Sequence, residues 1–229
     1  MNTQTRREIR SGLIALALSG LMFTLGIPLR GQVDLTDLGS YIIRAALSPN
    51  YLLGWIIILV GGVLQLYGFF GLYRYLTYQT ENLIALLALV LRIVGLALGL
   101  PLFTFLTVNG PVIAELYQQG NQEVITVVEA NFTGLGLVLL GVAAVAAIIG
   151  LILFAIAIWR DGRLSKWTVI LFVLSLPLLA FAVTFITEFL GAVLFLISTS
   201  LIAWKGWHES VVGARQYEPD INLRSRDSN

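Results

Sequence analysis

The sequence predicts an all-α fold: a polytopic integral membrane bundle of six transmembrane helices over residues 1–207, with a short surface helix in the first outer loop. Its 229 residues are 58% hydrophobic and only 12% charged, and the mean hydropathy is +0.88. A soluble domain carries about 25% charged residues. The apolar residues form long runs, and ~20 consecutive apolar residues are enough to cross a ~30 Å hydrocarbon layer. Both observations indicate a membrane protein.

The first span is expected at about 11–29. A basic start before an apolar run is typical of a cleaved signal peptide, but this run is longer than a usual signal core. No A-x-A site follows it, so we expect an uncleaved helix. The loop at residues 30–50 is expected to contain a helix that is too short to span the membrane and that ends at Ser48-Pro49-Asn50. We expect it on the outer membrane surface, before a second span at about 51–72.

The third span, at about 82–107, carries a single charge, Arg92, roughly 15 Å from its start. At about 100° per residue, Arg92 shares a face with small residues that include Gly95 and Gly99. Arginine is costly in lipid and small residues allow close helix contact, so we expect this face to be buried in the bundle. Gln65 lies at a matching depth on the second span, because a short turn joins the two spans. We expect its side-chain oxygen to accept a hydrogen bond from Arg92.

An acidic segment without Lys or Arg, Val108–Ala130, follows the third span. Pro111 and the glutamine-rich stretch at 118–122 are expected to break it, while 112–117 is compatible with a helical extension. The fourth span, at about 131–159, is rich in glycine and alanine. Small residues four positions apart suit close helix contact. The helix-packing candidates in this span are Ala143, Ala147 and Gly150.

Two more spans complete the predicted bundle. The fifth, at about 167–187, follows a tight basic turn, and Pro177 should kink it. Glu188 marks the hairpin to the sixth span, at about 189–207. Residues 208–229 form a polar tail without a periodic apolar face, which we expect to be disordered.

The cationic residues predict the orientation. With the N-terminus inside, eleven of the 14 Lys and Arg residues fall in cytoplasmic segments, whereas Arg30 and Arg44 fall outside and Arg92 lies in the membrane. Cytoplasmic loops of membrane proteins carry an excess of Lys and Arg. Both termini are therefore expected in the cytoplasm, and the tail at 208–229 is cytoplasmic.

Several stretches carry a family resemblance. The run LSPNYLLGWII, followed by GLYRYLTYQTENLIALLALVLRIV, resembles the uncharacterised bacterial membrane proteins grouped as domain of unknown function 4386. The WRDGRLSKW turn and the closing AWKGW are also similar. In that family a carboxylate often follows the span-three arginine by one helical turn, where this chain has Gly95. The resemblance covers most of the chain and implies a six-helix fold in a bacterial plasma membrane, but no reaction. The matching positions are Leu72, Tyr73, Arg74, Leu76 and Arg92.

Arg92, Gln65 and Ser175 form the candidate polar site, because they lie at similar depth inside the predicted bundle. An intramembrane charge is a functional candidate by default. One interpretation is that Arg92 faces a cavity and receives an anionic group, such as a lipid phosphate or a substrate carboxylate. The other is that Arg92 only hydrogen-bonds Gln65, serines and carbonyls, or extends to the inner headgroups.

The residue types favour a protein without catalytic activity. The chain has no cysteine and one histidine, His208, so it cannot build a thiolate, zinc or haem site from its own residues alone. No hydrolase, protease or nucleotide-binding motif is present. We therefore expect no enzymatic activity and no cofactor, and a function as an accessory, sensory or assembly protein. The alternative is a small carrier or channel for an anionic or amphiphilic solute or lipid, using Arg92.

The expected partners follow from these alternatives. They are the lipid bilayer, an anionic lipid or small anion, and a protein partner or a second copy of the chain; nucleic acid is not expected. One interpretation of the G-x-x-x-G of Gly95 and Gly99 is homodimerisation, but we favour helix packing within the bundle. A cavity around Arg92 would favour the carrier, and a filled interior would favour the accessory protein.

Overall fold

The structure is a computed structural model that describes residues 3–32, 48–79, 81–180 and 184–215. All regular secondary structure in these ranges is helical. The expected surface helix of the first loop and the end of the polar tail lie outside the described residues. The helices are α1 (Thr3–Arg30), α3 (Pro49–Thr77), α4 (Leu83–Gln118), α5 (Val124–Phe132), α6 (Gly134–Asp161), α7 (Lys166–Ala180) and α8 (Phe185–Arg215).

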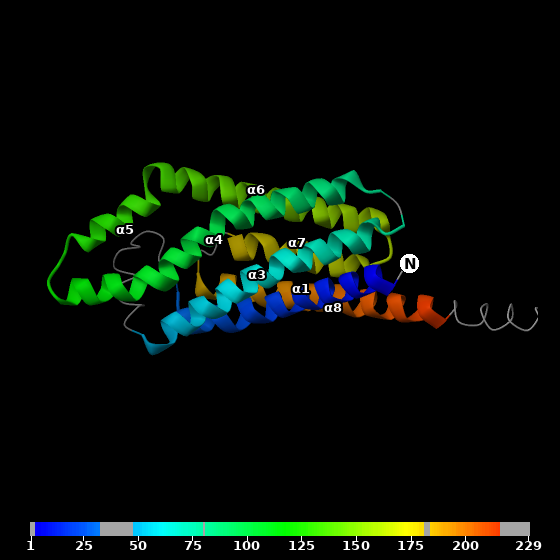
Figure 1. The fold of residues 1–229 in the computed structure, drawn as a ribbon, viewed down its shortest axis with the longest axis horizontal. Helices are drawn as coiled ribbons and strands as arrows, with labels where there is room; N and C mark the ends of the chain where they lie inside the picture. Colours follow the sequence, from blue (N-terminus) through cyan, green and yellow to red (C-terminus); the bar gives the residue numbers. More distant parts are fainter. Residues whose placement is uncertain (1–2, 33–47, 80, 181–183, 216–229) are drawn as a thin grey trace, which may run out of the picture.

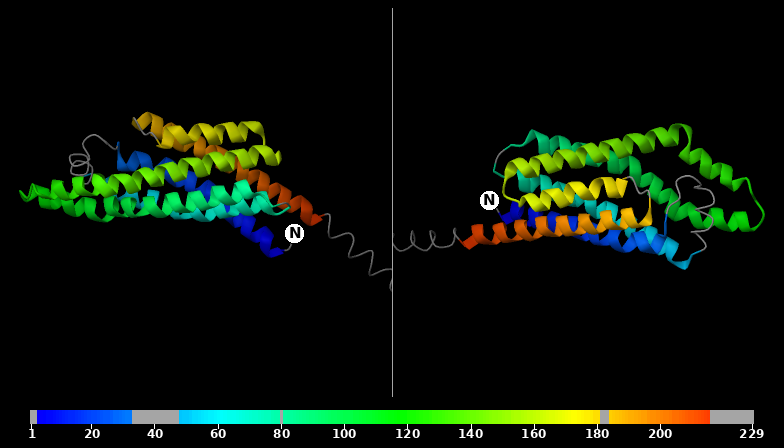
Figure 2. Two further views of the ribbon diagram at one scale, coloured as in Figure 1. Left: turned by 90° about the horizontal axis from the view of Figure 1, so that it is seen from above. Right: turned by 180° about the vertical axis from the view of Figure 1, so that it is seen from behind.

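The helices form one elongated bundle (Figure 1). Six of the described helices make a closed ring in the order α1, α3, α4, α6, α7, α8, with α8 returning to α1. Helix α5 lies between the ends of α4 and α6 and contacts both. The N-terminus and the end of α8 lie at the opposite end of the bundle in every view (Figures 1 and 2). We call the end of the bundle that holds α5 the α5 end, and the end that holds the N-terminus and the last turns of α8 the terminal end.

Five helices are long and apolar enough to cross a membrane: α1, α3, α4, α6 and α8. Helix α7 is apolar but has only 15 residues. Many large apolar side chains on these helices face outward, such as Val63, Leu135 and Val145. An apolar surface of this extent suits a lipid-facing bundle, because soluble monomers rarely expose contiguous apolar patches larger than a few hundred Å². The all-α prediction is confirmed for the described residues, and the five candidate spans are compatible with a helical membrane bundle.

The predicted break at Pro111 is wrong. Helix α4 runs without interruption through both Pro101 and Pro111 and ends at Gln118, so the stretch at 112–117 is helical. Proline removes one backbone hydrogen bond from a helix but its fixed φ is helical, and the long α4 tolerates that loss. Gly120, with φ of +91°, lies in the turn that ends this segment.

Three further boundaries differ from the sequence prediction. The fourth span begins at Gly134 rather than at 131, because Thr133 is extended and separates α5 from α6. Glu188 lies in the first turn of α8 rather than in a hairpin, and the residues from 185 to 187 belong to α8 instead of the fifth span. Helix α8 also continues to Arg215, so the predicted disorder of the tail is wrong for 208–215.

The buried apolar side chains form two cores. The terminal-end core contains the stacked rings of Phe69 and Phe154 and includes residues from α6 and α7. The α5-end core contains Tyr51 and Trp55 and includes buried residues from α1, α3, α4, α5 and α8. Helix α6 has no buried residue before Ala143. The turns of α6 before Ala143 therefore contribute no buried side chain to either core.

Candidate functional site

A cavity of about 300 Å³ lies within the ring of helices. All six ring helices contribute to its lining, which is mostly aliphatic and aromatic. Its charged and amide side chains are Arg92 and Gln65, together with Arg30 and Glu188. Ala144 both lines the cavity and is exposed on α6, so the cavity reaches the outward surface of that helix.

Arg92 is buried, with 4% of its surface exposed. Its Nη2 donates a hydrogen bond to Oε1 of Gln65 at 2.6 Å, and its Nη1 donates to the carbonyl of Ala147 at 3.3 Å. The guanidinium carbon lies 4.6 Å from the ring centroid of Phe69. Nε has no hydrogen-bond partner. The burial of Arg92 and its pairing with Gln65 agree with the sequence analysis.

The charge of Arg92 has no counterion in the described parts of the chain. The ion pairs there are Arg30–Glu188, Arg74–Glu8, Arg163–Asp161 and Lys205–Glu209. A guanidinium has five N–H donors, and two neutral oxygens accept from only two of them. A buried charge normally needs a partner of opposite sign. The site is therefore chemically suited to an anion.

Close contact between α4 and α6 positions this site. A Cβ on Gly95 would lie 2.8 Å from the backbone nitrogen of Ala147 and 2.9 Å from the carbonyl oxygen of Ala143. A Cβ on Gly150 would lie 3.0 Å from the carbonyl oxygen of Ala88. The predicted packing role agrees with the structure at these positions. The close approach also brings the Ala147 carbonyl within reach of Arg92.

The packing prediction is wrong for Gly99. A Cβ at Gly99 would meet nothing within 4 Å, and Gly99 lines the cavity instead. The helical period places Gly95 and Gly99 on one face of α4, but α6 approaches that face only at Gly95. The Gly95 surface is thus occupied by α6 of the same chain.

Arg30 and Glu188 form a second polar pair in the cavity wall, joining α1 to α8. Their side chains are 5% and 12% exposed, and the Arg30 guanidinium lies 4.8 Å from the Trp55 ring centroid. Sequence reasoning missed this pair. The available signal was that two opposite charges, 158 residues apart, lie at the same end of their predicted spans. Because the pair is neutral overall, Arg92 supplies the net charge of the cavity.

Ser175 does not belong to the site. It is fully buried, but its hydroxyl donates to the carbonyl of Phe172 at 2.7 Å, and it does not line the cavity. Ser19 and Ser198 likewise donate to carbonyls of their own helices. Serine in a helix commonly satisfies its hydroxyl this way. The prediction that Ser175 joins Arg92 and Gln65 is wrong.

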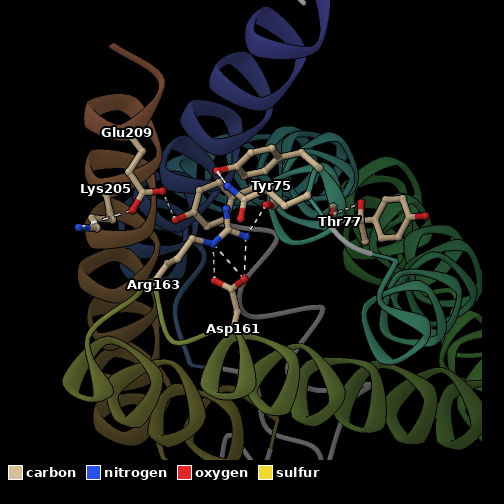
Figure 3. A network of polar contacts seen from close by, with 9 residues as sticks. Tyr75, Thr77, Asp161, Arg163, Lys205 and Glu209 are labelled. Carbon is tan, nitrogen blue, oxygen red and sulfur yellow. Dashed lines mark hydrogen bonds and ion pairs between the residues drawn. The ribbon is translucent and has the colours of Figure 1, made fainter. Parts of the chain in front are cut away.

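A separate polar network fastens the terminal end (Figure 3). Arg163, in the turn after α6, donates to the Asp161 carboxylate and to the Tyr75 carbonyl at 2.8 Å. The Tyr75 hydroxyl donates to Glu209 at 2.7 Å, and Lys205 pairs with the same carboxylate. Burial lowers the pKa of Arg163, but hydrogen bonding to Asp161 and the electrostatic contributions of Tyr75, Asp161 and Tyr78 together outweigh it and raise the pKa above its usual value. This network ties α3, α6 and α8 together away from the cavity.

The described residues contain no group of three or more His, Cys, Asp or Glu side chains placed to hold a metal ion. His208 is exposed and contacts the Trp204 ring at 4.4 Å between centroids. No protein family, curated protein or solved structure matches the chain.

Proposed function

We propose that the chain binds a small anionic amphiphile inside the membrane and carries it, with Arg92 as the anchor for the anionic group. The observation that supports this proposal is an apolar cavity of about 300 Å³ that reaches a buried arginine, for which the described residues provide no counterion. Ligand sites in proteins are clefts of about 300–1,000 Å³ with mostly apolar walls and a few polar groups. An accessory protein acting through its outer helix faces does not need such a cavity.

The electrostatics favour a charged ligand. Phe69 and two neutral oxygens are the partners of Arg92, and an intramembrane charge is costly. A bound carboxylate or phosphate oxygen would replace the lost hydration with a charge-assisted hydrogen bond, roughly twice as strong as a neutral one. Arg92 has N–H donors for this bond beyond the two that Gln65 and Ala147 accept.

The proposal includes a topology of six spans with both termini in the cytoplasm of a bacterium. Helix α7 is the sixth span: it packs between α6 and α8, and its 15 residues extend about 22 Å. The excess of Lys and Arg at the terminal end supports the orientation. The resemblance to the domain of unknown function 4386 is consistent with this setting.

The test compares small molecules that copurify with the wild-type chain and with Arg92→Leu. We expect mass spectrometry to find an anionic species in the wild type that the variant lacks, while the variant is equally or more stable because it loses a buried charge. Arg74→Leu is the matched control, since Arg74 is partly exposed and pairs with Glu8 outside the cavity. Identical extracts from all three proteins would remove the binding proposal and leave the accessory function.

A further inference from the structure

We infer that the ligand of this cavity is an aromatic monocarboxylate of one ring. This inference rests on the proposed function and names its ligand class. Three properties of the cavity lead to it: one net charge, aromatic walls and a small volume.

The charge limits the ligand to a monoanion. Arg30 is neutralised by Glu188, so Arg92 is the unbalanced cation among the described residues that line the cavity. A dianion would leave one buried negative charge without a partner, which is unfavourable in an apolar site. The two Nη groups of Arg92 carry N–H donors beyond those that Gln65 and Ala147 accept, and a carboxylate accepts a charge-assisted hydrogen bond from such a donor.

The walls favour a flat ring. Phe23, Trp55, Phe103 and Phe195 all line the cavity. The rings of Trp55 and Phe103 lie 5.8 Å apart, and those of Phe23 and Phe195 lie 6.4 Å apart in an edge-to-face arrangement. Aromatic rings attract one another at these separations beyond simple burial of apolar area. A rigid ring also loses less conformational entropy on binding than an alkyl chain of the same size.

The dimensions match one ring with a short carboxylate arm. The cavity of about 300 Å³ has the volume of a small-ligand site. Trp55 and Gln65 are ten residues apart on α3, so the two ends of the cavity are about 15 Å apart.

The test measures binding of 4-hydroxycinnamate to the purified full chain by titration calorimetry. We expect binding about tenfold tighter than that of octanoate or 3-cyclohexylpropanoate, the ratio given by a well-placed aromatic contact. Neutral 4-hydroxycinnamyl alcohol should not bind, and Arg92→Leu should abolish binding of the acid. Gly99→Leu should also abolish it, because the side chain enters the open space at this position.

Gly141→Leu is the matched control for Gly99→Leu. A Cβ at Gly141 also meets nothing within 4 Å, but Gly141 is exposed and does not line the cavity, so this variant should bind as the wild type does. Equal binding of the three acids, still dependent on Arg92, would overturn the aromatic ligand class and leave the proposed function standing. Absence of 4-hydroxycinnamate binding would overturn the inference as well, while the copurification experiment judges the proposed function independently.

Discussion

Adding one methyl group at Gly95 tests whether the contact between α4 and α6 shapes the site. The Cβ of Gly95→Ala would lie 2.8 Å from the Ala147 nitrogen, and ordinary van der Waals contact begins at 3.4 Å. The obstacle is backbone, which cannot rotate away, so the two helices must separate by about 0.6 Å. Overpacking of this kind costs about 1–3 kcal/mol. The bond from Arg92 to the Ala147 carbonyl, already 3.3 Å long, would be lost.

Gly99→Ala is the matched control for Gly95→Ala. It adds the same methyl group to the same helix, so the gain in helix propensity of about 1 kcal/mol cancels in the comparison. Nothing lies within 4 Å of its Cβ. At about 2–4 °C per kcal/mol for a chain of this size, Gly95→Ala should melt roughly 2–12 °C below Gly99→Ala. Thermal unfolding of both variants in the same detergent measures this difference. Equal midpoints would show that α6 does not approach α4 at Gly95.

Two further predictions concern the ends of the bundle. Single cysteines at Gly120 and Gly162 should be labelled from opposite sides of intact cells, and equal labelling of both by an impermeant reagent would contradict the proposed topology. Glu188→Leu should destabilise the chain by about 3–5 kcal/mol, because it leaves Arg30 buried without its partner. Thermal unfolding should show that adding Arg30→Leu to this variant restores most of the loss; a double variant as unstable as the single one would mean that the ion pair is not the cause.

Local sequence patterns predicted much of the arginine site. The short turn between the second and third spans places Gln65 and Arg92 at the same depth, and the small residues beside Arg92 indicate a buried face. Both signals are local: the first comes from two helices joined by a short turn, and the second from residues of a single helix. Helical period also identified Gly95, Ala147 and Gly150 as residues of a contact face.

The remaining features depend on where distant helices meet. Arg30 pairs with Glu188 only because the last helix returns to the first, and no local pattern reports that closure. The helical period places Gly99 on the same face of α4 as Gly95, but it does not predict where α6 diverges from α4. Ser175 was misplaced for a different reason: depth alone does not tell whether a hydroxyl turns to its own helix or to a neighbour.

The order of helices in the ring determines when each partner of Arg92 becomes available during biosynthesis. Chains are synthesised from the N-terminus, so α3 with Gln65 precedes α4, whereas the Ala147 carbonyl arrives only with α6. Of these two acceptors, only Gln65 can accompany the arginine as it leaves the translocon. Helices α3 and α4 therefore insert most favourably as a pair. Glu188 becomes available to Arg30 only with α8, so the nascent protein holds that cation without its counterion until α8 has been synthesised.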